Sequence, residues 1–169
     1  MRKISVKLAV SLIAILVLVG CTFTFSSSVV VSVSGLGSDS DDAERDPVYI
    51  FAFLNKGDRD AAWEEIQSEA TAGSFNDFLY GYFPQGCYQQ KNAEYVTNDN
   101  ALFQQGASTG TTFNIRWGTA FPETGEDYDR EWVYFIAASE SNGVCYGGTK
   151  DYMMTSGGSN NTTVIVSEL

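Results

Sequence analysis

The 169-residue chain contains no histidine. This absence excludes catalysis by Ser–His and Cys–His pairs, and it excludes metal sites that need an imidazole ligand. Basic residues are also scarce, because ten Lys and Arg stand against 21 Asp and Glu, for a net charge of −11. Such an acidic surface repels phosphate backbones and anionic lipid headgroups. We therefore expect no nucleic acid partner.

The N-terminal apolar run is too short to cross a bilayer. Leu8 to Val19 is interrupted only by Ser11 and contains about a dozen residues, whereas a membrane span needs roughly 20. Arg2, Lys3 and Lys7 precede the run. A positive start followed by a short apolar stretch is typical of a cleaved export signal.

The end of this run, Leu18-Val19-Gly20-Cys21, resembles the lipobox of bacterial lipoproteins. The resemblance implies cleavage before Cys21, which leaves residues 1–20 as a signal peptide, and it implies a diacylglyceryl group on the Cys21 sulfur. Several acyl chains on one residue give a stable membrane anchor. Thr22, in place of Asp, favours sorting to the outer membrane where a cell has two. We expect a lipid-anchored protein of the bacterial cell envelope.

The mature chain is long enough for one domain. Removing residues 1–20 leaves 149 residues, with seven basic and 21 acidic side chains and a net charge of −14. A chain of this size can bury a substantial core. We predict a short lipidated tether over residues 21–28 and a single domain over residues 29–169, although Thr22 to Ser28 could also be the first half of a strand.

Two cysteines remain once Cys21 carries lipid. Cys87 and Cys145 form an even pair in an exported chain, and this arrangement favours a disulfide. The alternative is two buried thiols that are not bonded to each other.

Several short segments have the pattern of β-strands. Residues 29–34 and 111–121 alternate between apolar and polar side chains, as expected for strands with one buried face. Residues 48–54 are continuously apolar, which is typical of a strand buried on both faces, and residues 132–139 have the composition of another buried strand. Residues 151–155 and 162–167 add two more candidates.

The strongest local signal is Asn142-Gly143 between two apolar runs. This dipeptide favours a two-residue type I′ hairpin, in which Ser141 lies opposite Val144 and Glu140 opposite Cys145. The one helical candidate covers residues 60–70, with Asp60 as its N-cap.

About seven short strands with at most one short helix indicate a mainly β protein. We predict a two-layer antiparallel β-sandwich of immunoglobulin-like or transthyretin-like type.

Two features could hold a ligand. Carboxylates gather in two loops, and calcium is the natural cation for them, with Asp39, Asp41 and Asp42 as weak candidates; solvated acidic loops are the simpler explanation. Five aromatic residues could form a platform for sugars or peptides, although core packing also explains them. They are Tyr80, Tyr82, Phe83, Tyr88 and Tyr95.

The sequence assigns no catalytic residue. Our leading hypothesis is a non-enzymatic binding or interaction domain that recognises an envelope protein or a glycan. One alternative is a structural subunit of an envelope assembly. Another is a hydrolase that uses two carboxylates, which the lack of histidine does not forbid.

Overall fold

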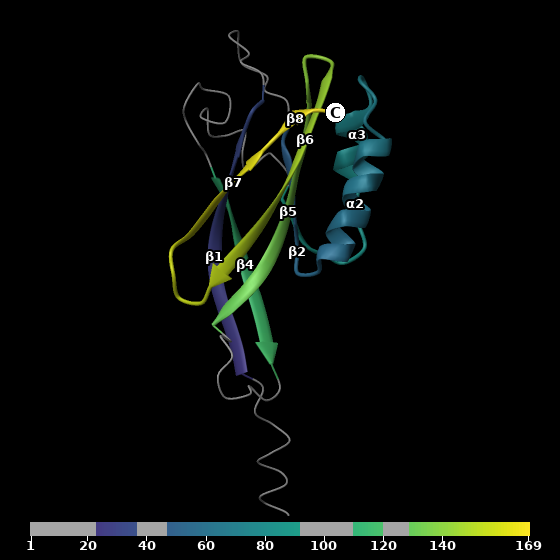
Figure 1. Ribbon diagram of the computed structural model, residues 1–169. Coiled ribbons are helices and arrows are strands. Elements are labelled where there is room, and N and C mark those ends of the chain that lie inside the picture. Colours follow the sequence, from purple (N-terminus) through teal and green to yellow (C-terminus); the bar gives the residue numbers. More distant parts are fainter. Residues whose placement is uncertain (1–22, 37–46, 92–109, 120–128) are drawn as a thin grey trace, which may run out of the picture.

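Two β-sheets pack face to face, and two helices cover the outer face of the larger sheet (Figure 1). This computed structural model describes residues 23–36, 47–91, 110–119 and 129–169. Its strands are β1 (Phe23–Ser34), β2 (Tyr49–Phe53), β3 (Cys87–Lys91), β4 (Gly110–Thr119), β5 (Arg130–Ser141), β6 (Val144–Thr155), β7 (Asn160–Ile165) and β8 (Ser167–Glu168). Its helices are α2 (Lys56–Ser68) and α3 (Phe75–Gly81).

The sheets confirm the prediction of a mainly β fold built from two layers. The smaller sheet has the strand order β4-β1-β7, and the larger has the order β3-β2-β5-β6-β8. One pairing differs from the antiparallel prediction, because β7 runs parallel to β1. The helices add a third layer beside the larger sheet.

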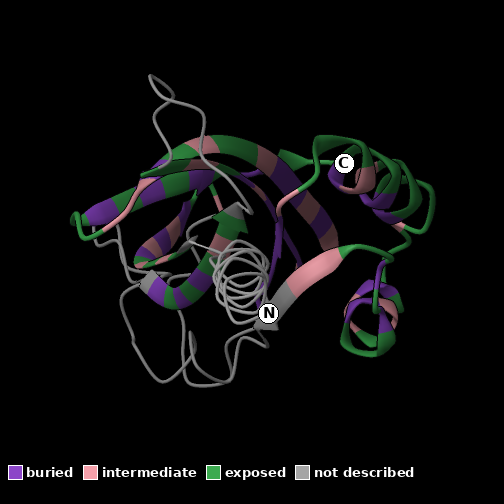
Figure 2. Ribbon diagram, turned by 90° about the horizontal axis from the view of Figure 1, so that it is seen from below, coloured by how far each residue is buried: buried purple, intermediate pink, exposed green. Residues whose placement is uncertain are grey.

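Each layer boundary has its own core. The first core lies between the sheets and includes Val31, Phe113 and Phe135. The second lies between the larger sheet and the helices and includes Phe51, Ile66 and Ile136. All five residues of β2 are buried because both of its faces are covered, and Figure 2 shows buried and exposed residues alternating along strands that have one open face.

The β5–β6 hairpin has the predicted register. Ser141 pairs with Val144 and Glu140 with Cys145, as the Asn-Gly turn requires. Asn142 and Gly143 have φ values of 51° and 71°, the left-handed conformation that a type I′ turn needs. In this register Cys145 lies on the helix-covered face of the larger sheet.

The predicted tether over residues 21–28 is too long, because β1 already begins at Phe23. Residues 23–28 pair with β4 in continuous antiparallel register, and the rings of Phe25 and Trp117 lie 6.1 Å apart. Along β1, the exposed residues Thr24, Ser26 and Ser28 alternate with Phe25 and Ser27, which are half-buried. The same two-residue period that marks residues 29–34 therefore extends back to Thr24.

The helical predictions need two corrections. The first helix begins at Lys56 rather than Asp60, because Asn55 Oδ1 accepts hydrogen bonds from the backbone N–H groups of Gly57 and Asp58, at 2.7 and 3.2 Å. There is also a second helix, α3, where at most one was expected. Its N-cap residue, Ser74, makes no side-chain capping bond.

The predicted disulfide is not formed in this fold, and no bond joins Cys87 to Cys145. The cysteines lie on β3 and β6, with β2 and β5 between them. Three inter-strand steps span about 14 Å, whereas disulfide-bonded Cα atoms are usually less than about 7 Å apart. The alternative of two thiols that are not bonded to each other therefore describes this fold.

Candidate functional site

An open groove of about 760 Å³ runs beside β7. Its lining comes from three strands, with two residues from β1, two from β6 and four from β7. They are Val30, Ser32, Lys150, Tyr152, Asn161, Thr162, Thr163 and Ile165. None of them is acidic, so the groove differs from the strongly acidic chain around it.

Among the described residues, β7 is an edge strand, and β6 approaches it near its end, where Gly148 lies against the Ile165 carbonyl. Within the described part of the chain, β7 pairs only with β1 and ends the smaller sheet. Natural edge strands usually carry a charge, a proline or a bulge that prevents further pairing. The β7 segment NNTTVI has no charge and no proline, and it is rich in β-branched residues.

Asn160 fixes the position where β7 begins. Its buried side chain accepts a hydrogen bond from the Thr155 backbone N–H (3.0 Å) and donates one to the Thr155 carbonyl (3.0 Å). It also donates to Ser27 Oγ (2.9 Å), and so it connects β6, β7 and β1. This rigid start holds the following residues of β7 in a defined register beside the groove.

Lys150 supplies the groove's one positive charge. The side chain is exposed, and no described carboxylate lies within ion-pair distance of it. Tyr152 lies two residues further along β6 and donates a hydrogen bond to Asn160 Oδ1 (3.4 Å). The groove therefore combines an unpaired strand edge, small polar side chains and an accessible ammonium group.

A second hollow, of about 220 Å³, lies at the turn of the β5–β6 hairpin and is lined in part by Glu140. The Glu140 carboxylate accepts hydrogen bonds from the backbone N–H groups of Gly73 and Phe75 at the start of α3. Asn76 bonds both the backbone N–H and the carbonyl of Glu140, each at 2.9 Å. These groups are used to hold α3 against the sheet.

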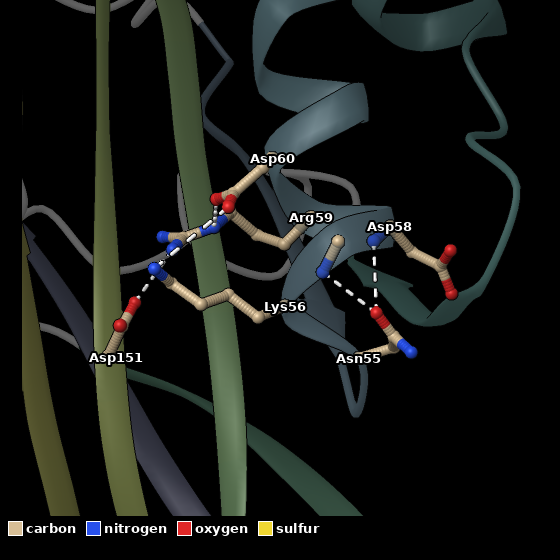
Figure 3. A network of polar contacts seen from close by, with 7 residues as sticks. Asn55, Lys56, Asp58, Arg59, Asp60 and Asp151 are labelled. Atoms are coloured by element: carbon tan, nitrogen blue, oxygen red, sulfur yellow. Dashed lines mark hydrogen bonds and ion pairs between the residues drawn. The ribbon is translucent and has the colours of Figure 1, made fainter.

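The cluster around Arg59 joins α2 to β6 (Figure 3). The buried guanidinium lies 2.9 Å from the Asp151 carboxylate and sits above the Tyr134 ring, 5.7 Å from its centroid. Its Nε is 2.7 Å from Asp60 Oδ1 but makes no hydrogen bond of good geometry, so this contact is electrostatic. Asp151, Asp60 and the Tyr134 ring already surround the guanidinium, so the cluster serves to hold α2 against β6.

The predicted aromatic platform is divided between core and surface. Tyr82 is buried, and its hydroxyl donates a hydrogen bond to Glu65 Oε2 (2.7 Å). Burial first, and then the Glu65 carboxylate, raise the pKa of Tyr82 far above its usual range. Tyr88 is half-buried, whereas Tyr80 and Phe83 are exposed. Core packing therefore explains Tyr82, and the four described residues of this set do not form one surface.

Other predicted site residues lie outside the described residues. These are the lipidation site Cys21, the calcium candidates Asp39, Asp41 and Asp42, and the aromatic residue Tyr95. Elsewhere, the described residues contain no group of three or more His, Cys, Asp or Glu side chains that could hold a metal ion. None of the described helices is both long enough and apolar enough to cross a bilayer.

Sequence reasoning missed the groove. The relevant signal was the uncharged β-branched segment NNTTVI, but its place at the edge of a sheet depends on strand order, which the sequence did not reveal. No protein-family model, curated protein or solved structure matches this chain.

Proposed function

We propose that this protein is a lipid-anchored lipoprotein of the bacterial envelope that binds an extended polypeptide as an added strand on β7. It acts without catalysis, as a binding domain held at the membrane, and the outer membrane is its expected location. The observation that carries this proposal is the uncharged strand β7, which ends the smaller sheet among the described residues and lies beside a groove of about 760 Å³.

Strand addition uses backbone groups for affinity and side-chain contacts for specificity. In a strand, every second residue directs its N–H and C=O away from one neighbour. The outer edge of β7 therefore offers donors and acceptors over its first residues, whereas the Ile165 carbonyl near its end lies against Gly148 of β6. Lys150 can pair with a carboxylate of the bound segment. An acidic side chain or a C-terminal carboxylate fits this position.

A polypeptide suits the groove better than a glycan. Sugar sites commonly use exposed aromatic rings as stacking platforms. The groove contains one half-buried ring, Tyr152, whereas the exposed aromatic residues Tyr80, Phe83 and Trp132 do not line it. Hydrolysis by paired carboxylates is disfavoured because no carboxylate lines the groove.

Photocrosslinking in intact envelopes tests the proposal. A photoreactive amino acid would replace Asn161, Thr163 or Ile165, which are exposed on β7, with Thr112 and Asn114 of β4 as matched exposed controls. Mass spectrometry would then locate each adduct on the partner. If the partner adds as a strand, moving the photoreactive residue by two positions along β7 should move the crosslinked position by two residues along the partner.

Three outcomes separate the possible functions. A regular two-residue progression on another protein supports the proposal, and Lys150→Gln should then weaken crosslinking while the α2 control Lys56→Gln does not. A progression on β7 of a second copy supports the structural-subunit alternative. Adducts without a constant register, or equal adducts from β4, contradict strand addition.

A further inference from the structure

Very little chain separates the proposed lipid from the folded domain. Cys21 precedes the first residue of β1, Phe23, by two positions. Two extended residues reach about 7 Å. If Cys21 is acylated, as proposed above, the start of β1 must therefore lie almost at the bilayer surface.

The beginning of β5 and the end of β6 lie at this same end of the molecule (Figure 1). Ser156, directly after β6, donates a hydrogen bond from its Oγ to the Ser26 carbonyl of β1, at 3.4 Å. Its backbone N–H donates to the Asp129 carbonyl just before β5, at 2.6 Å. The anchor therefore brings these strand ends close to the membrane together with β1.

Trp132 and Met153 are uncovered at this end. They are direct cross-strand partners on the helix-covered face of the larger sheet, yet 44% of Trp132 and 39% of Met153 is exposed. The next residue on this face of β5 is Tyr134. Its ring is covered because Arg59 of α2 lies above it. The Trp132 ring lies nearly parallel to that of Tyr134, with the ring centroids 6.3 Å apart.

We infer that the surface formed by Trp132 and Met153 docks onto the bilayer that holds the lipid anchor. Tryptophan favours the membrane interface because its ring is apolar while its N–H can contact water or headgroups. The anchor raises the effective concentration of the surface at the bilayer, so a weak contact suffices. The occupant is an uncharged lipid interface, since a mature chain of charge −14 is repelled by anionic headgroups.

Docking would also set the height of the groove above the bilayer. The groove-lining residues of β1, Val30 and Ser32, lie seven and nine positions after Phe23. At about 3.3 Å per residue, they are more than 20 Å along the strand from the anchored end. The groove beside β7 would then lie well above the bilayer surface, where a partner can reach it.

Tryptophan fluorescence with brominated lipid tests the inference on the full lipidated protein. The chain has three tryptophans: Trp63, Trp117 and Trp132. One variant keeps only Trp132 (Trp63→Phe, Trp117→Phe), and a matched control keeps only Trp63 (Trp117→Phe, Trp132→Phe). Trp63 packs beside Gly147, whose partner Ala138 is six residues, or about 20 Å, from Trp132 along β5.

Each variant is reconstituted in phosphatidylcholine vesicles with or without bromine in the upper part of the acyl chains. Bromine should reduce Trp132 fluorescence at least about twofold, because an interfacial indole contacts these chain segments. Trp63 fluorescence should not change. Circular dichroism confirms that both variants are folded before they are compared.

The intact mass of each preparation separates the two proposals. A mature protein without acyl chains overturns the lipid anchor and the docking surface together. An acylated protein in which bromine quenches Trp132 no more than Trp63 overturns the docking surface alone.

Discussion

Asn160 shows how much of the fold one buried amide can organise. Its side chain satisfies both backbone groups of Thr155 and contacts β1 at Ser27. A buried amide that lost these partners would leave several polar groups unsatisfied.

We expect Asn160→Ala to lower the free energy of unfolding by about 3 kcal/mol, since it removes several hydrogen bonds and leaves buried groups unpaired. The neighbouring variant Asn161→Ala is a matched control at an exposed position and should change it by less than about 0.5 kcal/mol. Urea denaturation of both variants measures the difference. Equal losses would contradict the role assigned to Asn160.

Cys145 predicts a pH dependence of stability. Burial first, and then the Glu140 carboxylate, raise the pKa of the Cys145 thiol above its ordinary value. A group whose pKa is raised in the folded state stabilises the fold fully below its unfolded pKa, and this contribution is lost as the pH rises through the folded pKa. Stability should therefore decline as the pH rises above about 8.5, the ordinary thiol value.

Cys145→Ala should make this alkaline decline smaller. Urea denaturation of the wild type and the variant at neutral and alkaline pH measures the effect. Tyr82 also has a raised pKa and contributes a further decline at higher pH in both proteins. If the free energy of unfolding depends on pH in the same way in both proteins, the Cys145 thiol does not contribute to the alkaline decline.

At the scale of elements, local sequence patterns predicted the strands. Tertiary contacts determined the short helix α3 and the separation of the two cysteines. The continuous apolar run became β2, and the Asn-Gly turn fixed the β5–β6 register residue by residue. These features are local, because side-chain periodicity and turn conformation depend on neighbouring residues.

The helix α3 could not be predicted in the same way. It has only seven residues, and Glu140 holds its N-terminal backbone N–H groups from 65 residues further along the chain. Such a short helix depends on tertiary support. The cysteine prediction was wrong for a related reason, since counting cysteines does not reveal that two strands separate them.

The contact of α2 with β6 depends on Arg59. We expect Arg59→Ala to lower the free energy of unfolding by about 2 kcal/mol, less than for a fully buried pair because Asp151 remains partly solvated. The exposed pair of Lys56 and Asp60 is a matched control, and Lys56→Ala should cost less than about 0.5 kcal/mol. Thermal denaturation measures both, and similar losses would contradict a specific role for Arg59.

The chain passes from β7 to β8 directly against Gly148 of β6. There is no room for a side chain at this position. A Cβ on Gly148 would lie 2.1 Å from the Ile165 carbonyl oxygen, which belongs to the backbone and cannot move cheaply. Gly148→Ala should therefore cost more than about 2 kcal/mol. Gly81→Ala, in open space at the end of α3, should change stability by less than about 1 kcal/mol, measured by urea denaturation.

At the scale of the whole molecule, the fold places two surfaces at different heights above the proposed anchor. Trp132 and Met153 lie at the end where β1 begins, whereas the groove beside β7 lies further along β1. This arrangement allows one surface to contact lipid while the other receives a polypeptide. The sequence alone predicted the anchor and the sandwich, but it could not predict that β7 would end the smaller sheet among the described residues.

The most direct test of this account is the distribution of the wild type and Cys21→Ser proteins between membrane and soluble fractions, with the intact mass of each. We predict that the wild type sediments with membranes and carries the mass of its acyl chains. Cys21→Ser should lose both properties, with the same circular dichroism and melting temperature for the domain. A Cys21→Ser protein that stays in the membrane fraction as firmly as the wild type, or a wild type without acyl mass, would contradict the account.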